Sequence, residues 1–151
     1  MSSFYKLSIK EVRRESPEAI SVLFNVPLEF KDFYRFTAGQ YINLKLTLNG
    51  QEIRRAYSLC STPESGDLRI SIKSVVGGNF SVFANKELKA GDVLEVGTPE
   101  GKFTFQPDAA RQKNYMAFAA GSGITPVMSI AQSILISEPK STMVLVYGNK
   151  T

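Results

Sequence analysis

The stretch Arg54-Arg55-Ala56-Tyr57-Ser58-Leu59 decides how the rest of this sequence is interpreted. An arginine presents a planar set of N–H donors that pairs with phosphate oxygens. Two residues after Arg55, Tyr57 offers a ring face for stacking, and Ser58 adds a hydroxyl that can meet a ring nitrogen. These residue types predict contacts to a ligand with phosphates at one end and a flat ring at the other. The simpler alternative is an edge strand with ordinary surface residues, and the remaining chain decides between the two.

The sequence on both sides of this stretch has the pattern of β-strands. Apolar residues recur along four runs, which cover residues 20–26, 42–48, 68–72 and 93–96. Turn-forming clusters rich in Gly, Pro, Asn and Asp separate these runs. Phe103 and Phe105 lie two residues apart and are expected to face inward. Short strands at this spacing predict a six-stranded antiparallel barrel, closed so that no strand edge stays open.

One helix is predicted inside this β region. The segment 80–88 has apolar residues at helical spacing, and Asn79 is the predicted N-cap. The preceding Gly77-Gly78 pair lets a ligand approach bare backbone, where free N–H groups and the helix dipole favour an anion. Ser81 adds a hydroxyl in the first turn. The alternative is a glycine turn that only leads into a packing helix.

After Pro107 the pattern changes to that of an α/β unit. The loop Gly121-Ser122-Gly123-Ile124-Thr125-Pro126 leads into a helix over residues 127–136, with Thr125 as the predicted N-cap and Pro126 as the first helical residue. On either side, two runs are apolar without alternation, as in buried parallel strands: residues 114–120 and 142–147. A doubly wound dinucleotide-binding fold begins with this order of elements, although Pro126 replaces the third glycine of the usual fingerprint.

Composition and charge narrow the classes of partner. With 43% hydrophobic and 21% charged residues, the chain has the composition of an ordinary globular domain. The net charge of +4 is not gathered in a Lys/Arg block, so nucleic acid is not an expected partner. No apolar run approaches the roughly 18 residues needed to span a membrane, and the first residues lack the apolar core of a signal peptide.

Cysteine and histidine usage narrows the chemistry. The single cysteine, Cys60, excludes an internal disulfide and a four-cysteine iron–sulfur cluster within the chain. It also favours a reducing, cytoplasmic compartment. The sequence has no histidine, which removes Ser–His and Cys–His nucleophile schemes, and no metal site is expected.

Three motifs follow one another along the chain: Arg55-Ala56-Tyr57-Ser58, then Gly77-Gly78 with Ser81, then the Gly121–Pro126 loop. In this order and at these distances they resemble the ferredoxin–NADP reductase superfamily. Within it, the segment Gly78–Asn85 is most similar to the reductase components of bacterial phenylacetyl-CoA epoxidases, which act in phenylacetate degradation. The resemblance implies an FAD-binding barrel followed by a nicotinamide-binding domain. In the epoxidase reductases it also implies a C-terminal [2Fe–2S] domain, which residues 1–151 do not contain.

The resemblance also implies roles for individual residues. It implies that Arg55 holds the FAD pyrophosphate, that Tyr57 stacks on the flavin ring and that Ser58 meets the ring near N5, so Tyr57 and Ser58 are the expected catalytic residues. It also implies that Gly78, Asn79 and Ser81 contact the FAD pyrophosphate and that Ile72 and Lys73 border the flavin. The nicotinamide nucleotide is expected to contact the loop residues Gly121, Gly123, Thr125 and Pro126. Strict alternation puts Arg55 and Tyr57 on one face of a strand and Ser58 on the other, so the strand is expected to twist or end by Ser58.

These observations predict a mainly β protein with two parts. Residues 1–107 are expected to form a six-stranded antiparallel Greek-key β-barrel that binds FAD and carries one capping helix. Residues 108–151 are expected to form the first β-α-β unit of an α/β nucleotide-binding domain. Because such a domain has about five strands, the chain is expected to be a fragment of a longer reductase, natural or engineered.

The expected function is electron transfer from NADH or NADPH through FAD to an iron–sulfur centre or an oxygenase. The sequence does not distinguish NADH from NADPH. A non-catalytic flavin-binding or protein-interaction module on the same barrel stays an alternative. An incomplete nucleotide-binding unit should leave apolar residues uncovered, so self-association and little activity of the chain alone are expected. The residues expected at this surface are Phe118, Ile130, Ile134, Met143, Leu145 and Val146.

Overall fold

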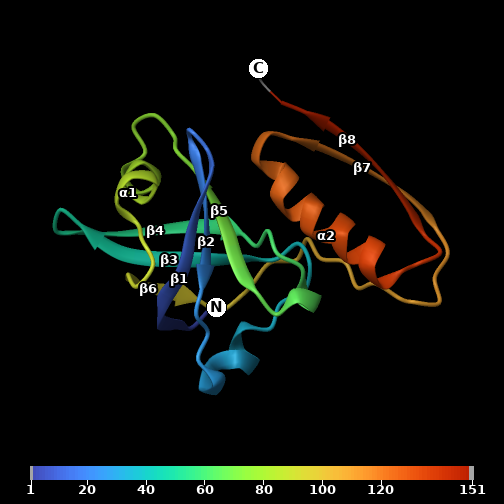
Figure 1. Ribbon diagram of the computed structural model, residues 1–151, viewed down its shortest axis with the longest axis horizontal. Helices are drawn as coiled ribbons and strands as arrows, with labels where there is room; N and C mark the ends of the chain where they lie inside the picture. The colour runs from blue at the N-terminus through green and yellow to red at the C-terminus, as the bar shows by residue number, and fades with distance from the viewer. Residues whose placement is uncertain (1, 150–151) are drawn as a thin grey trace.

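The computed structural model describes residues 2–149, and its largest element is a six-stranded antiparallel sheet (Figure 1). The strand order is β4-β3-β6-β1-β2-β5, which is not the order along the chain. The strands are β1 (Phe4–Ser16), β2 (Ala19–Phe24), β3 (Tyr41–Leu48), β4 (Gln51–Ser58), β5 (Leu68–Lys73) and β6 (Val93–Gly97). Two short 3-10 turns, η1 (Leu28–Tyr34) and η2 (Pro63–Ser65), connect strands.

The sheet curls until its two edge strands meet. An isolated antiparallel bridge joins Leu59, just after β4, to Ile70 of β5. Beside it, the Cys60 N–H donates to the Arg69 carbonyl at 2.9 Å. The alternating residues of the sheet point into the space that the curl encloses, and Ile42, Leu44, Ile70 and Ile72 are fully buried there. The expected six-stranded antiparallel fold is therefore confirmed.

Two details of this region differ from the sequence-based expectation. Phe103 is 62% exposed instead of facing inward. Phe105, which forms a bridge with Ala38, packs its ring edge-on against Tyr115 at 5.4 Å between centroids. The segment after β6 forms only isolated bridges, from Glu100 to Tyr41 and from Phe105 to Ala38, before it reaches the second part of the chain, so its alternation does not mark a core strand.

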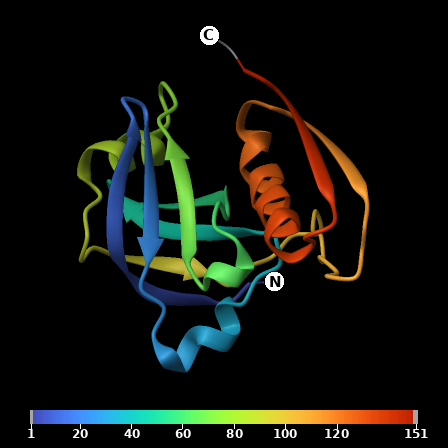
Figure 2. The same cartoon turned by 45° about the vertical axis from the view of Figure 1, so that its right-hand side comes forward.

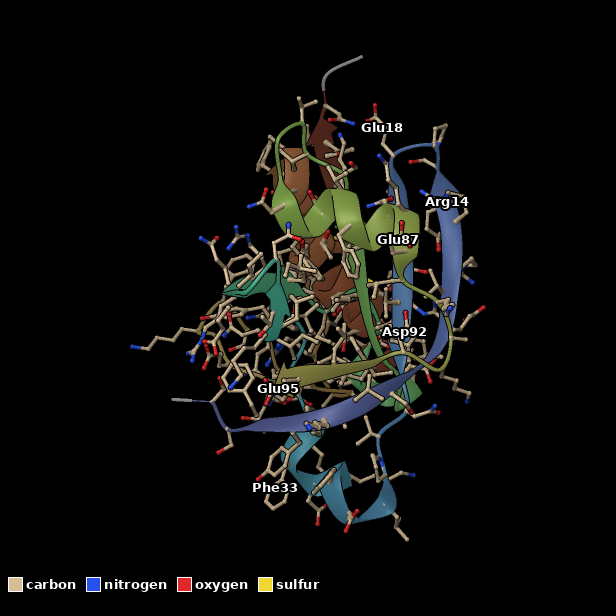
Figure 3. The ribbon with its side chains drawn as sticks, turned by 90° about the vertical axis from the view of Figure 1, so that its left-hand side faces the viewer. Arg14, Glu18, Phe33, Glu87, Asp92 and Glu95 are labelled. Carbon is tan, nitrogen blue, oxygen red and sulfur yellow. The ribbon has the colours of Figure 1, made fainter. Side chains whose placement is uncertain are left out.

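Helix α1 (Asn79–Glu87) covers one open end of the curled sheet. Its Phe80 and Ala84 side chains are buried in the core. Its far end is tied down by Asn85, whose amide donates to the Ile72 carbonyl at 3.1 Å and whose Oδ1 accepts from Arg14 at 2.9 Å. Figure 3 shows Arg14 of β1 beside the end of α1 that carries Glu87.

The second part of the chain is a β-α-β unit. Strands β7 (Asn114–Ala120) and β8 (Thr142–Gly148) pair in parallel, and between them lie the turn η3 (Gly121–Gly123) and helix α2 (Ile124–Ser137). Figures 1 and 2 show α2 between the curled sheet and the β7–β8 pair. One face of the pair packs against α2, while Met116, Phe118, Val144 and Val146 are exposed on the other face.

The exposed apolar surface differs in membership from the expected set. Phe118 and Val146 are exposed as expected, but Ile134 is 1% exposed because it faces inward from α2. Ile130, Met143 and Leu145 are half-buried. The strands thus alternate in exposure despite their unbroken apolar sequence, since only one of their two faces is covered.

Both predicted helix starts lie close to the observed ones but with different caps. Gly78 is the N-cap of α1, so Asn79 is its first helical residue and not its cap. Helix α2 continues from the η3 turn with Gly123 as N-cap, so Thr125 and Pro126 lie in its first turn. A proline is tolerated there because first-turn N–H groups have no intrahelical acceptor.

Candidate functional site: the end of β4, the start of α1 and the start of α2

The β4 strand and the α1 helix meet through two aromatic rings. Tyr57 and Phe80 lie 5.8 Å apart between ring centroids, with their planes tilted by 51°. In the β3–β4 ladder Tyr57 is opposite Ile42 and Arg55 is opposite Leu44. Arg55 and Tyr57 therefore share one face of β4, and this face leads to the start of α1.

The two adjacent arginines have different surroundings. Arg54 forms an ion pair with Glu52 at 3.1 Å, and its guanidinium lies 5.5 Å from the centre of the Phe4 ring. Arg55 is exposed and has no carboxylate partner among residues 2–149; within these residues its guanidinium forms one hydrogen bond, to the Arg54 carbonyl at 2.8 Å. Arg55 is thus the arginine whose charge stays available for an anionic ligand.

Tyr57 is half-buried beside Arg55. Burial raises the pKa of its phenol, and the positive charge of Arg55 partly opposes that rise. The phenol is therefore neutral at physiological pH. A neutral ring that is only partly buried is suited to stack on a second flat ring.

Strand β4 ends at Ser58, which is still paired with Tyr41 of β3. The next N–H, that of Leu59, donates to the Gln40 carbonyl at 3.0 Å and so extends the same β3–β4 register by one residue, which leaves Ser58 on the strand face opposite to Tyr57. The Ser58 hydroxyl has no hydrogen-bond partner within residues 2–149. It is available to a ligand that reaches the end of the strand.

The start of α1 is built for close approach of a ligand to backbone. Gly77 has φ +77°, which favours glycine. At Gly78 an added Cβ would lie 2.6 Å from the Ser81 Oγ and 3.0 Å from the Val75 carbonyl oxygen, so a side chain there would force its neighbours to shift. The Ser81 hydroxyl accepts from the Val75 N–H at 3.0 Å and so fixes the loop shape.

This helix start fits a pyrophosphate group. Within the described residues no side chain caps α1, so its first-turn N–H groups can receive an anion, as the helix dipole favours. Asn79 is exposed beside them. Ile72 is fully buried, so only its backbone can border a ligand, and Lys73 is exposed at the end of β5.

The glycine loop before α2 forms a second bare helix start. Gly121 has φ +57° and its carbonyl accepts from the Tyr147 hydroxyl at 3.4 Å. Gly123 caps α2 without a side-chain bond, and Thr125 and Pro126 are half-buried in the first turn. Figures 1 and 2 show the starts of α1 and α2 toward the same end of the molecule.

One buried polar group has no counterpart in the sequence-based expectations. Glu138 is fully buried after α2. Its carboxylate accepts from the Asp108 N–H at 3.0 Å, from Arg111 at 3.2 Å, from Tyr115 at 2.9 Å and from Ser141 at 2.8 Å. Burial pushes its pKa upward, but these hydrogen bonds outweigh burial and lower the pKa below its ordinary value. Glu138 thus connects the segment before β7, which contains Asp108 and Arg111, to β7 and to the turn before β8.

Metal binding and membrane insertion both lack support in the part of the chain that the structure describes. Residues 2–149 contain no group of three or more His, Cys, Asp or Glu side chains arranged to hold a metal ion. Within the same residues, neither helix combines the length and apolar character that crossing a bilayer requires.

Comparisons with known proteins give relatives over the whole chain. A subunit of the 1,2-phenylacetyl-CoA epoxidase of Escherichia coli (strain K12) is 41% identical over 151 residues, covering 100% of this chain and 42% of that protein. The ferredoxin reductase component of the 3-ketosteroid-9-alpha-monooxygenase of Rhodococcus rhodochrous is 33% identical over 95% of this chain and 40% of its own length. The chain therefore spans about two-fifths of the length of each of these two curated relatives.

A solved structure and two family models give the same result for the fold. Phthalate dioxygenase reductase superimposes with a TM-score of 0.78 at 26% identity, covering 99% of this chain and 44% of that one. The oxidoreductase NAD-binding domain model matches residues 118–151. The oxidoreductase FAD-binding domain model matches residues 6–105, which is more than half of the chain. The chain belongs to the FAD-binding domain family of oxidoreductases.

Proposed function

We propose that this chain is the FAD-binding part of an NAD(P)H-dependent reductase, with the flavin nucleotide held between the end of β4 and the start of α1. The observation that carries the proposal is the contact of Tyr57 with Phe80, which joins the strand that carries Arg55 to the helix whose start has no side-chain cap within residues 2–149. Arg55 neutralises the pyrophosphate together with the first-turn N–H groups at Gly78, Asn79 and Ser81.

At the other end of the nucleotide, the chain positions the ring. The Tyr57 ring covers one face of the flavin and keeps water from it, while the Ser58 hydroxyl donates to the ring edge. The backbone of Ile72 and Lys73 borders the same ring. FAD, when bound, supplies the redox chemistry of hydride uptake and single-electron release.

The nicotinamide nucleotide binds at the second helix start, where Gly121, Gly123, Thr125 and Pro126 lie. Both cofactors are then bound at one end of the molecule, as hydride transfer requires. In this proposal residues 1–107 form the flavin domain and residues 108–151 form part of the nicotinamide domain. NADH and NADPH are equally compatible with these residues.

The electron acceptor is an iron–sulfur centre or an oxygenase partner. Phthalate dioxygenase reductase is described as transferring electrons from pyridine nucleotides to a [2Fe–2S] cluster, and the relative from E. coli belongs to a phenylacetyl-CoA epoxidase. By analogy the complete protein acts in phenylacetate degradation in the cytoplasm. No group of residues 2–149 is arranged to hold such a cluster, so the proposal assigns it to another part or another protein.

Titration of the flavin-free chain with FAD tests the binding half of the proposal. Saturable quenching of flavin fluorescence, with a shifted visible spectrum, is expected; no binding would contradict it. The catalytic half is tested by dye reduction with NADH and with NADPH. Turnover should be slow for this chain and fast for a longer chain that continues through the remaining NAD-binding strands. A longer chain that binds FAD but is not reduced would favour the non-catalytic alternative.

A further inference from the structure

Three serines on α2 face the barrel at intervals of four residues. The Ser129 hydroxyl donates to the Ser61 carbonyl at 2.9 Å. The Ser133 and Ser137 hydroxyls both donate to the same oxygen, Oε1 of Glu64, at 2.7 and 3.1 Å. Residues four apart lie on one helix face, so the three serines form a row along the face that meets the η2 turn.

This row is polar within an apolar helix. Ser129 and Ser133 are 0% exposed, and their neighbours Ala131 and Ile134 are also buried. A buried hydroxyl is costly without a hydrogen-bond partner, and helix formation itself does not favour serine. A one-residue slip or a rotation of α2 would leave Ser133 without its acceptor. The serine row therefore defines one position of α2 on the barrel.

Glu64 provides the negatively charged acceptor for the Ser133 and Ser137 hydroxyls. Burial pushes the pKa of its carboxyl upward, but hydrogen bonds from Ser133 and other groups outweigh burial and lower it. The group is therefore ionised at neutral pH, and bonds to an ionised acceptor are stronger than neutral ones. Glu64 forms no ion pair among residues 2–149. The groups of α2 that bind its carboxylate are hydroxyls and not cations.

The chain connectivity links this contact to the proposed cofactor sites. Glu64 lies in the loop that leads from Ser58 at the end of β4 to β5. Its serine partners lie on the helix that begins at the Gly121–Pro126 loop. We propose that Glu64 is a positioning residue, which fixes α2 and the glycine loop at its start against the flavin-binding barrel. The consequence for hydride transfer rests on the proposed function, whereas the contact itself does not.

Spin labels on the 151-residue chain test the position directly. One label replaces Thr47 of β3 and the other replaces Lys140 after α2, both exposed, in a Cys60→Ser background. The distance distribution between the labels should be narrow in the parent and broad in Glu64→Ala. Glu64→Gln should stay narrow, because the amide keeps the oxygen that accepts both hydroxyls. Glu29→Ala, at an exposed glutamate of η1, is the matched control and should match the parent.

Amide exchange and FAD titration on the same variants separate the possible failures. Glu64→Ala should raise exchange in α2 by about tenfold or more while β1–β6 exchange and FAD affinity stay unchanged. A parent-like distance distribution and α2 exchange in Glu64→Ala would overturn the positioning role. Equal loosening in Glu64→Gln would also overturn it, since the acceptor oxygen is retained. A parent chain that does not bind FAD would contradict the proposed function and leave the exchange result on Glu64 intact.

Discussion

At the scale of single residues, Arg54 and Arg55 provide a matched pair for testing the flavin site. Arg55→Ala should weaken FAD binding by roughly 2–3 kcal/mol, the scale of a charge-assisted bond. Arg54→Ala should have a much smaller effect, because Arg54 is already paired with Glu52 on the other face. Flavin titration of both variants measures the difference. Equal losses would show that the phosphate contact has been assigned to the wrong arginine or does not exist.

Tyr57 should act through its ring and not through its hydroxyl. Tyr57→Phe should keep most of the FAD affinity, since the ring that stacks is retained. Tyr57→Ala should lose much of it and should show less quenching of flavin fluorescence. Because Tyr57 also contacts Phe80, thermal unfolding of each variant should be measured alongside. Similar affinities for the Phe and Ala variants would exclude a stacking role.

At the residue level, the sequence pointed to groups with distinctive local chemistry, and their contacts with a ligand stay predictions. The motif around Arg55, the glycines before the two helices and the end of β4 at Ser58 were all identifiable, because they depend on nearby residues. Glu138 was not, because its four donors come from residues 108 to 141 and meet only in the folded chain. Ser133 was missed for the same reason: its acceptor, Glu64, is 69 positions away.

At the scale of elements, the start of α1 depends on a glycine at position 78. Gly78→Ala would place a methyl group 2.6 Å from the Ser81 Oγ and 3.0 Å from the Val75 carbonyl. The loop must shift, and we expect FAD affinity to fall by about tenfold or more, in line with overpacking costs of roughly 1–3 kcal/mol. Gly123→Ala is the control, because nothing lies within 4 Å of its added Cβ and its φ is −61°. Unchanged affinity with unshifted amide resonances near residue 78 would contradict the expectation.

The β-α-β unit should lose stability in acid through Glu138. Its pKa is lowered in the folded chain, so its contribution is fully present above the unfolded value of about 4.3 and is lost as pH falls through the lower folded value. NMR melting of β7 and β8 signals at pH 7 and pH 3 measures this loss. Glu138→Gln should melt earlier at pH 7 and depend less on pH. An unchanged pH dependence in that variant would exclude Glu138 as the source.

Elements with a clean apolar period or an unbroken apolar run were predictable, and β1 was not. The alternation over residues 20–26, 42–48 and 68–72 corresponds to β2, β3 and β5. Strand β1 is the longest strand, yet charged residues at positions 10, 11, 13 and 14 interrupt its apolar pattern. The charges are tolerated because that half of β1 is largely exposed and paired mainly through its backbone to β2.

At the scale of the whole molecule, the uncovered face of β7 and β8 should promote self-association. Phe118 is 70% exposed and lies opposite Val146 in the parallel pair, with Met116 opposite Val144 next to it. Such a contiguous apolar patch is uncommon on monomers. Sedimentation at several concentrations should show association that Phe118→Asp weakens, with Phe103→Asp as an exposed control in a different segment. A parent chain that stays monomeric at all concentrations would contradict this.

The pairing of β1 with β6 sets the order in which the molecule can be completed during synthesis. Phe4 of β1 lies opposite Gly97 of β6. Nearly a hundred residues must therefore be synthesised before β6, the second neighbour of β1, is present. The β1–β2 and β3–β4 hairpins can form as they emerge, since their partners are adjacent in sequence. The insertion of β6 between β3 and β1 is the long-range step of folding. It can occur only after Gly97 has left the ribosome exit tunnel. Until then one edge of β1 is unprotected, and chaperone contact should concentrate on nascent chains shorter than this length.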